Sequence, residues 1–310
     1  MTSSSSVPAV HVNEEVRTAL SERRAVVALE STIVVQGLPA PVNLDVADAC
    51  EAAVRAAGAV PATAGVVAGR AIVGLTRQDL EALADPSRGA AKLSARDLGL
   101  ATASHTWGAT TVAGTIALAH RVGVAVMATG GLGGVHQGAS QSFDESADLT
   151  ALSRTPVLVV ASGVKSILDI PATLERLDSL GVPVVGYRTR HFPGFYLEDS
   201  GVDLDWSLDE PEQAAAAFAH HRVFSPTGFL LANPVASASA LSRDLHDRAL
   251  AAAREAVRVE GATGQAVTPV MLAAFARVTG GESVRTNRDL VVANAALAGR
   301  VAVALASSAT

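Results

Sequence analysis

The sequence predicts an α/β fold in which helices cover both faces of a largely parallel central sheet. Apolar, strand-like segments alternate with helical segments along most of the chain, which is the order typical of parallel sheets. The composition agrees, because 49% of residues are hydrophobic, mostly Ala, Val and Leu, and only 4% are aromatic. No repeat, linker or domain boundary is visible in the 310 residues, so we expect a disordered tail at 1–13 and a single α/β domain at 14–310.

Each expected element is marked by its hydrophobic period and by the turn formers that flank it. Hydroxyl residues, for example, open one of the helices in the first half of the chain. In chain order, the expected elements are a polar helix at 14–24, a strand at 25–30, a helix at 45–58, two short strands within 58–75, helices at 78–85 and 110–119, alternating strands and helices from 124 to 190, an alanine-rich helix, a strand-like segment at 223–235 and long C-terminal helices.

Charge and composition exclude several classes of protein. The formal net charge of -6 provides no global basic field of the kind that binds nucleic-acid backbones, so polymeric nucleic acid is not an expected partner. The single cysteine, Cys50, excludes an internal disulfide framework and a cysteine-rich zinc site. The N-terminus does not read as a signal peptide, and the apolar runs are too short or too interrupted to span a bilayer. We therefore expect a cytoplasmic protein with no membrane partner.

Lys165 is a candidate nucleophile. It lies in VVASGVKSILDI, directly after an apolar strand and at the start of an expected helix. Burial favours the neutral amine, which can form a Schiff base with a sugar aldehyde. From position alone, a lysine whose ammonium group reaches solvent is the commoner explanation. The loop ATGGLGGVHQG also follows a strand, and its backbone amides can approach an anion, although glycine turns without a ligand are equally frequent.

Other titratable residues are candidates for acid–base or metal chemistry. Glu30 ends a strand, His136 lies in the glycine loop, and Asp144, Glu145 and Asp148 form an acidic cluster. They could donate protons or bind a hard cation. The cluster is also explained as the first turn of a helix, where carboxylates complement the dipole, and His136 as a structural histidine.

Twelve segments of the chain carry a family resemblance. In order they are ALESTIV, QGLPAPVN, GAVPATAGVVAG, KLSARDL, GATTVAGT, ATGGLGGVHQGA, SFDESADL, TPVLVVASGVKSILDI, GVPVVGYRT, FPGFY, LLANP and TGGESVRTN. Together they resemble the pseudouridine-5′-phosphate glycosidase family, which includes indigoidine synthase A-like proteins and biosynthetic C-ribosyl synthases. The resemblance covers the chain from about Glu30 to Asn294.

The resemblance implies a three-layer α/β/α fold, a homotrimer, and a reversible reaction that joins or separates ribose 5-phosphate and uracil. Lys165 is then the nucleophile at the sugar C1′ carbon, and Glu30 is the general acid or base. Asp144 is expected to bind a divalent cation such as Mn²⁺ or Mg²⁺. The expected substrate contacts are Lys92 at the phosphate, together with Val112, Thr129, His136, Ser146, Ala147, Asp148 and Asn287.

A lysine suits this reaction because a C-nucleotide has no leaving oxygen that an acid could protonate. An amine that opens the ribose forms an iminium ion, which is an electron sink beside the scissile carbon–carbon bond, and a nearby acid protonates the departing base. We also expect Lys92 to repel the charge on Lys165 and so help to keep that amine neutral.

Some residues depart from the family pattern, which leaves the aglycone open. Gln36, Gln137 and Ser140 replace the usual histidine, arginine and glutamate, Val164 replaces alanine, and His105 and Trp107 precede GATTV. The main alternative is therefore a C-glycosynthase that attaches ribose 5-phosphate to a larger aromatic compound. A sugar-phosphate-binding protein without activity is a further alternative, and no G-x-G-x-x-G supports a dinucleotide-binding enzyme.

Overall fold

The computed structural model describes residues 10–262 and 267–308. Eleven strands in the described part join in one sheet. The strands are β1 (His11–Val12), β2 (Val26–Leu29), β3 (Val60–Val67), β4 (Arg70–Val73), β5 (Ala91–Leu93), β6 (Gly108–Thr110), β7 (Val126–Ala128), β8 (Leu158–Ala161), β9 (Val184–Tyr187), β10 (Ser207–Leu208) and β11 (Phe229–Ala232).

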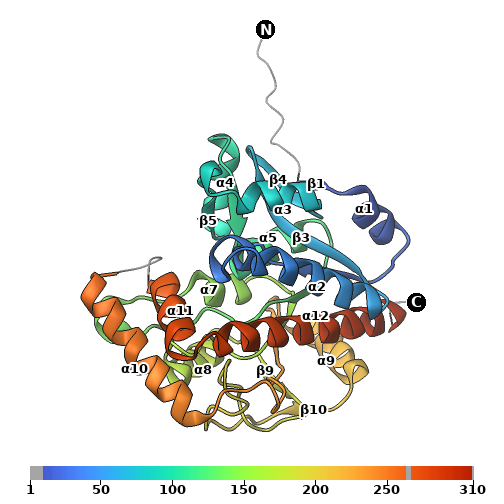
Figure 1. Ribbon diagram of the computed structural model, residues 1–310. Coiled ribbons are helices and arrows are strands. Elements are labelled where there is room, and N and C mark those ends of the chain that lie inside the picture. The colour runs from blue at the N-terminus through green and yellow to red at the C-terminus, as the bar shows by residue number, and fades with distance from the viewer. Residues whose placement is uncertain (1–9, 263–266, 309–310) are drawn as a thin grey trace.

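The central sheet is parallel, as predicted. Its order is β1-β4-β3-β2-β7-β8-β11-β9-β10, and every pair from β3 to β10 along this path is parallel. β3 is long enough to belong to both parts of this sheet. Its residues Val60–Thr63 pair with β2, and Ala64–Val67 pair with antiparallel β4. β6 is also antiparallel to β3, and β5 joins β6. A small side sheet therefore projects beyond the main sheet (Figure 1).

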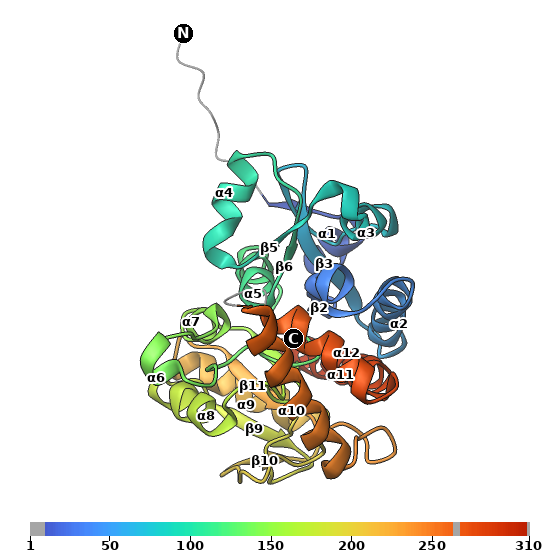
Figure 2. The same ribbon diagram turned by 60° about the vertical axis from the view of Figure 1, so that its left-hand side comes forward.

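Helices cover both faces of the main sheet, which gives three layers (Figure 2). α2 and α9 pack against α12 on one face, and α5 packs with α7 on the other. The helices are α1 (Glu14–Ser21), α2 (Val42–Ala56), α3 (Arg77–Ala84), α4 (Leu98–Ala103), α5 (Val112–Arg121), α6 (Ala139–Ser142), α7 (Ala147–Leu152), α8 (Ile170–Ser179), α9 (Pro211–Phe224), α10 (Arg243–Glu260), α11 (Val267–Val278) and α12 (Glu282–Ser308).

α12 is long and apolar enough to cross a membrane, with a mean hydropathy of 1.8 in its most apolar window. Half of that window is buried within the protein, and the helix packs along β2, β7 and β8 between α2 and α9. The strands beneath it are buried along their whole lengths. A helix that is apolar on most sides is expected at the centre of a large core. The apolar character of α12 is therefore explained by its place in the fold.

Several local predictions were wrong. His11 and Val12 form β1 beside β4, so the predicted tail at 1–13 is too long, and its residues 1–9 lie outside the described residues. Lys165 lies in a loop, because α8 begins only at Ile170. The turn-rich stretch after Glu30 contains a π-helical turn, Ile33–Gly37, a rare conformation that is frequent at functional sites.

Candidate active site

The candidate site lies where three neighbouring parallel strands end. Glu30 follows β2, Thr129 follows β7, and Lys165 follows β8 by four residues. Ligands of open α/β sheets bind beyond the carboxyl ends of the strands, so this edge is the expected place for a site. A main pocket of about 680 Å³ opens there, between the main sheet and the side sheet.

The main pocket brings together most of the predicted residues. Its lining contains Glu30, Lys92, Val112, His136, Asp144, Ser146, Ala147, Asp148 and Lys165. A side chamber of about 60 Å³ shares Glu30, Lys92 and Lys165 with the main pocket and contains Asn287. Thr129 lines neither space but lines a smaller cavity behind Glu30. The predicted set is therefore one site with two compartments, and Glu30 and Lys165 lie where the compartments meet.

Glu30 is held by hydroxyl groups on both carboxylate oxygens. Thr32 donates a hydrogen bond to one oxygen and Thr129 donates to the other. The amide group of buried Asn294 donates to the carbonyl oxygen of Thr129, at 2.8 Å. A carboxylate fixed in this way at a pocket wall is suited to proton transfer, because its orientation is set before substrate binds. Sequence reasoning missed Thr32, although ALESTIV contains it.

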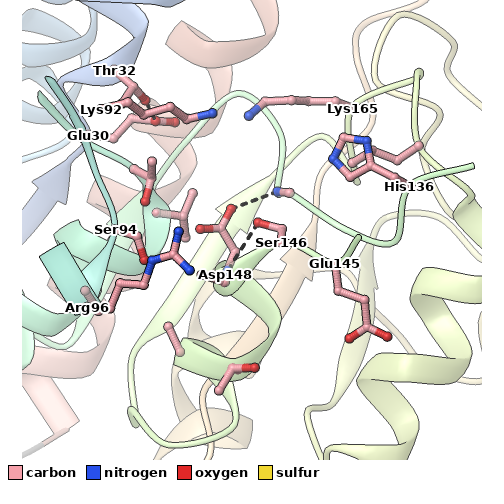
Figure 3. A pocket seen from close by; sticks show the side chains of 18 of the residues that line it. Glu30, Thr32, Lys92, Ser94, Arg96, His136, Glu145, Ser146, Asp148 and Lys165 are labelled. Carbon is pink, nitrogen blue, oxygen red and sulfur yellow. Dashed lines mark hydrogen bonds between the residues drawn. The ribbon is translucent and has the colours of Figure 1, made fainter. Parts of the chain in front are cut away.

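The amino groups of Lys92 and Lys165 point toward one another across the pocket (Figure 3). Lys92 comes from β5 of the side sheet, and Lys165 comes from the loop after β8. Burial lowers the pKa of Lys92, the charge of Lys165 lowers it further, and Asp148 and Glu30 act in the opposite direction. The repulsion between the two lysines therefore contributes to the lowered pKa of Lys92.

These two residues are the only lysines in the chain, and the other 22 basic side chains are arginines. A guanidinium stays charged at any physiological pH and serves for ion pairs, whereas a lysine amine can lose its proton and react. Lysine therefore occurs in this chain only at two positions that line the pocket. This pattern is readable from the sequence and gives a signal for both residues that is independent of the motifs.

Asp148 is the clamp that joins two walls of the pocket. One carboxylate oxygen accepts from the backbone N–H of Ala113 at the start of α5, and the other accepts from Gly133 in the glycine loop, both at 2.9 Å. A Cβ on Gly133 would lie 2.2 Å from the Ser146 hydroxyl, so only glycine permits this approach. Asp148 is 4% exposed, and both of its carboxylate oxygens accept from the backbone, so it supports the walls of the main pocket that it lines; its contact with substrate stays a prediction.

Replacing Asp148 by asparagine is therefore expected to destabilise the fold. The new amide NH₂ must face a backbone N–H, which leaves a buried donor without an acceptor and costs about 1–3 kcal/mol. Thermal or urea unfolding measures this loss. Thr150→Ala on the exposed side of α7 is the control, and a variant of Asp148 as stable as the wild type contradicts the clamp.

His136 and Asp144 lie on the rim of the main pocket. The Nδ1 atom of His136 is 3.9 Å from an Asp144 carboxylate oxygen. Burial lowers the pKa of His136, Asp144 opposes that shift, and Lys92 and Lys165 reinforce it. Among residues 10–262 and 267–308, no group of three or more acidic, histidine or cysteine side chains is placed to hold a metal ion. Asp144 could offer a carboxylate to a cation that keeps most of its water.

The side chamber combines glycines, an aromatic ring and two amide side chains with the aliphatic Ile33 and Leu272. Gln36 lies in the π-helical turn, Asn287 comes from α12, and Gly130 and Gly131 form one wall. Phe195 adopts a left-handed backbone conformation with φ of 64°, which is strained for a bulky residue. Its ring lies so close to Gly131 that a Cβ there would be 2.6 Å away. The chamber therefore presents a flat wall with two carboxamides.

The structure also adds residues that sequence reasoning missed. Ser94 and Arg96 lie in the same KLSARDL segment as Lys92 and line the main pocket beside Thr111, the residue that caps α5. Of the departures from the family pattern, only Gln36 lines either compartment. The others line neither compartment: they are His105, Trp107, Gln137, Ser140 and Val164.

Comparison with known proteins gives a consistent result. The model of the family described as indigoidine synthase A like protein matches residues 15–304. A pseudouridine-5′-phosphate glycosidase of Salinispora tropica is 57% identical over 296 residues, which cover 94% of this chain and 91% of that protein. A protein of the same name from Streptomyces griseus is 52% identical over 300 residues, with coverage of 96% and 92%.

Two solved structures share the fold. The prealnumycin C-glycosynthase AlnA, in complex with ribulose 5-phosphate, is 40% identical with a TM-score of 0.88, and the match covers 96% of this chain and 97% of that one. An indigoidine synthase A-like protein of Thermotoga maritima is 31% identical with a TM-score of 0.88, and the coverage is 97% and 98%. The predicted three-layer fold is therefore confirmed.

Proposed function

This chain belongs to the indigoidine synthase A-like family, and on that premise we propose that it reversibly cleaves pseudouridine 5′-phosphate into ribose 5-phosphate and uracil. Relatives that are 57% and 52% identical over nearly the whole chain have the corresponding name. The observation that carries the proposal is the position of Lys165 and Glu30, which lie together where the two compartments meet. A nucleophile and an acid at that boundary can act on a bond between a sugar and a base.

The chemistry is clearest in the direction of synthesis. The neutral amine of Lys165 condenses with the C1′ aldehyde of open-chain ribose 5-phosphate, one proton is taken up from solvent, and water leaves as the iminium ion forms. C5 of uracil then adds to C1′, Glu30 takes the proton from C5, and the C=N electrons return to nitrogen. The sugar O4′ hydroxyl finally displaces the amine and closes the ring; the hydroxyl proton goes to the leaving nitrogen, which restores the amine of Lys165, and Glu30 returns its proton to solvent. Cleavage follows the same steps in reverse, with Glu30 as the acid.

The test is the release of uracil. Purified protein with pseudouridine 5′-phosphate is expected to form uracil and ribose 5-phosphate in equal amounts, measured by chromatography, and to form the nucleotide again when both products are supplied in excess. Pseudouridine without phosphate is the matched control, since it lacks the group that the main pocket binds. Absence of uracil under all these conditions overturns the assignment.

We place the sugar phosphate in the main pocket. Lys92, Ser94, Arg96 and Thr111 line one side of it and supply ammonium, guanidinium and hydroxyl donors of the kind that bind phosphate. The planar base then enters the side chamber, where the amides of Gln36 and Asn287 can pair with the alternating N–H and C=O groups of uracil.

Phosphate binding is expected to weaken with rising pH earlier than for an ordinary lysine. The pKa of Lys92 is lowered, so its ammonium form is lost as pH rises through that lowered value, and the attraction for a dianion falls with it. Ribitol 5-phosphate, which has no aldehyde, isolates binding in a calorimetric titration from pH 7 to 10. Lys92→Arg keeps its charge, so it should flatten this profile; an equal fall in both proteins contradicts the assignment.

The alternative function is attachment of ribose 5-phosphate to a larger aromatic aglycone. The similarity to a C-glycosynthase over 96% of the chain favours it. The two carboxamides of the side chamber, Gln36 and Asn287, favour a small base with alternating N–H and C=O groups instead. Competition between uracil and a naphthoquinone-type acceptor for ribose 5-phosphate distinguishes the two, and selective consumption of the acceptor would reverse our preference.

Asp144 is the proposed protein ligand of a divalent cation, Mn²⁺ or Mg²⁺. The neighbouring Glu145 also lines the pocket but is paired with Arg176, and one carboxylate from Asp144 fits a cation that is bound mainly through water and substrate phosphate. Such a cation would offset phosphate charge. Removal of metal by EDTA is expected to weaken ribitol 5-phosphate binding at least about tenfold, with recovery on adding Mn²⁺. Asp144→Asn should bind the ligand weakly with or without metal; a normal metal response in this variant excludes Asp144.

We further propose a homotrimer located in the cytoplasm. Phe143, Trp206 and Phe224 are 84%, 71% and 85% exposed, and aromatic side chains are enriched at subunit contacts. The buried thiol of Cys50 requires no oxidising compartment. Sedimentation equilibrium at micromolar concentration measures the mass directly, and a monomeric mass overturns the assembly.

A further inference from the structure

Glu51 is a partly buried acid that the proposed reaction does not use. It lies on α2 and does not line the main pocket, and its carboxylate accepts a hydrogen bond of 2.6 Å from the hydroxyl of Thr63. Thr63 is 2% exposed and lies beside Leu29, the last residue of β2, in the parallel register. The residue after Leu29 is Glu30. The hydrogen bond with Thr63 therefore links Glu51 to the strand that lies beside the catalytic acid.

A small cavity connects this hydroxyl to the active site. Its volume is about 20 Å³, and its lining includes Glu30, Thr63, Thr129 and Cys50. This is enough space for one water molecule, which needs at least about 10–15 Å³ and two or more polar partners. The hydroxyls of Thr63 and Thr129 are such partners, because each donates to a carboxylate and keeps its lone pairs free to accept.

We propose that Glu51, Thr63, a buried water and Thr129 form a proton relay that exchanges protons between Glu30 and solvent. The Thr63 hydroxyl donates to the ionised carboxylate of Glu51, and it turns to donate to the water when Glu51 is protonated. Glu51 then donates its proton to the Thr63 oxygen, Thr63 passes its own proton to the water, the water passes one to Thr129, and Thr129 passes one to Glu30. Each hydroxyl and the water ends with as many protons as it had. The net change is one proton moved from Glu51 to Glu30, and solvent restores the proton on Glu51.

The position of Glu30 makes such a route useful. Glu30 borders both the main pocket and the side chamber, so sugar phosphate and base together cover its front face. Each cleavage consumes the proton that Glu30 carries, and each synthesis adds one. A path through the back of Glu30 restores its protonation state while the products are still bound. The relay therefore deepens the proposed function and rests on it.

The charges around Glu51 suit a proton donor. Burial raises the pKa of Glu51, Thr63 and Arg55 lower it, and Asp48 and Glu15 raise it. Arg55 is engaged by Glu15 of α1, which limits its pull on Glu51. Burial raises the pKa of the neighbouring Cys50 thiol to about 12, so this residue brings no charge into the cavity. Glu51 is partly exposed and can take protons from solvent.

Two variants interrupt the relay without touching either substrate compartment. Thr63→Val removes the hydroxyl at nearly constant shape, and Glu51→Gln removes the exchangeable carboxyl proton. Thr63→Ser restores a hydroxyl and is the rescue variant. Thr227→Val is the control, because Thr227 is a buried, hydrogen-bonded threonine that lines neither compartment. Thermal unfolding of all four variants identifies any loss of folded protein.

The measurements are the steady-state release of uracil and the rate at which borohydride traps the covalent adduct with ribose 5-phosphate. The relay predicts a loss of about tenfold in kcat for Thr63→Val and Glu51→Gln, with KM and the rate of adduct formation unchanged. Thr63→Ser should stay within about twofold of the wild type, as should Thr227→Val. Full turnover in Thr63→Val overturns the relay. An equal loss of adduct formation and of turnover in that variant overturns it as well, and so does a Thr63→Ser variant that recovers no turnover. If the wild-type protein releases no uracil, the proposed function is wrong. This outcome is distinct from failure of the relay, which is seen only in the variants.

Discussion

Lys165→Ala is expected to form no covalent adduct with ribose 5-phosphate and to lose at least about 10⁴-fold in kcat for uracil release. The side chain that forms the iminium ion is absent, and water or a free amine cannot take its place at the required concentration. Wild-type protein treated with ribose 5-phosphate and borohydride should gain one ribityl phosphate group, seen in the intact mass. The variant should gain none at the same concentrations.

The composition of the chain makes this experiment unusually selective. Besides the N-terminal amine, only Lys92 and Lys165 can form a Schiff base. Lys92→Ala is therefore the natural comparison: it should still form the adduct, but only at higher ribose 5-phosphate concentration, because it loses a charge at the phosphate. Peptide mapping of the labelled protein then locates the modified residue. An adduct that persists in Lys165→Ala and disappears in Lys92→Ala would exchange the roles of the two lysines.

The fold was predictable from the sequence because its strands and helices alternate in a regular pattern. Apolar strands such as VVAL and LLA are buried along their lengths, as parallel strands under helices must be. The side sheet was not predictable in the same way. β5 and β6 have three residues each, and β3 changes partners halfway along its length. These pairings depend on contacts between distant segments, which a local hydrophobic pattern does not encode.

The site was predictable where a residue type and a strand end coincide. Glu30 and Lys165 each follow an apolar strand, and parallel topology places both at one sheet edge. The supporting residues were harder to find. Asp148 is a predicted substrate contact in the motif, and it also binds two backbone amides. Phe195 becomes part of the wall of the side chamber only because its ring lies against Gly131. Such roles depend on the packing between elements far apart in the chain.

The roles of Glu30 and Lys165 can be separated by a second variant, Glu30→Gln. The amide keeps the size of the carboxylate. Its oxygen can accept from one of the two hydroxyls of Thr32 and Thr129, and its NH₂ can donate to the oxygen of the other, so the pocket should retain its shape. It cannot deliver a proton to C5 of uracil or remove one. We therefore expect kcat for uracil release to fall about 10³-fold, within the usual range for loss of a general acid or base.

Adduct formation with ribose 5-phosphate should survive in Glu30→Gln, because condensation of Lys165 with the aldehyde precedes any step at the base. The intact mass after borohydride treatment measures this half of the reaction, and chromatography of uracil measures the other half. Glu30→Asp is the matched control: it keeps an acid one methylene farther away and should recover part of the turnover. If Glu30→Gln loses the adduct together with turnover, then Glu30 acts on the lysine and the sugar. The acid for carbon–carbon cleavage must in that case be another side chain at the boundary of the two compartments.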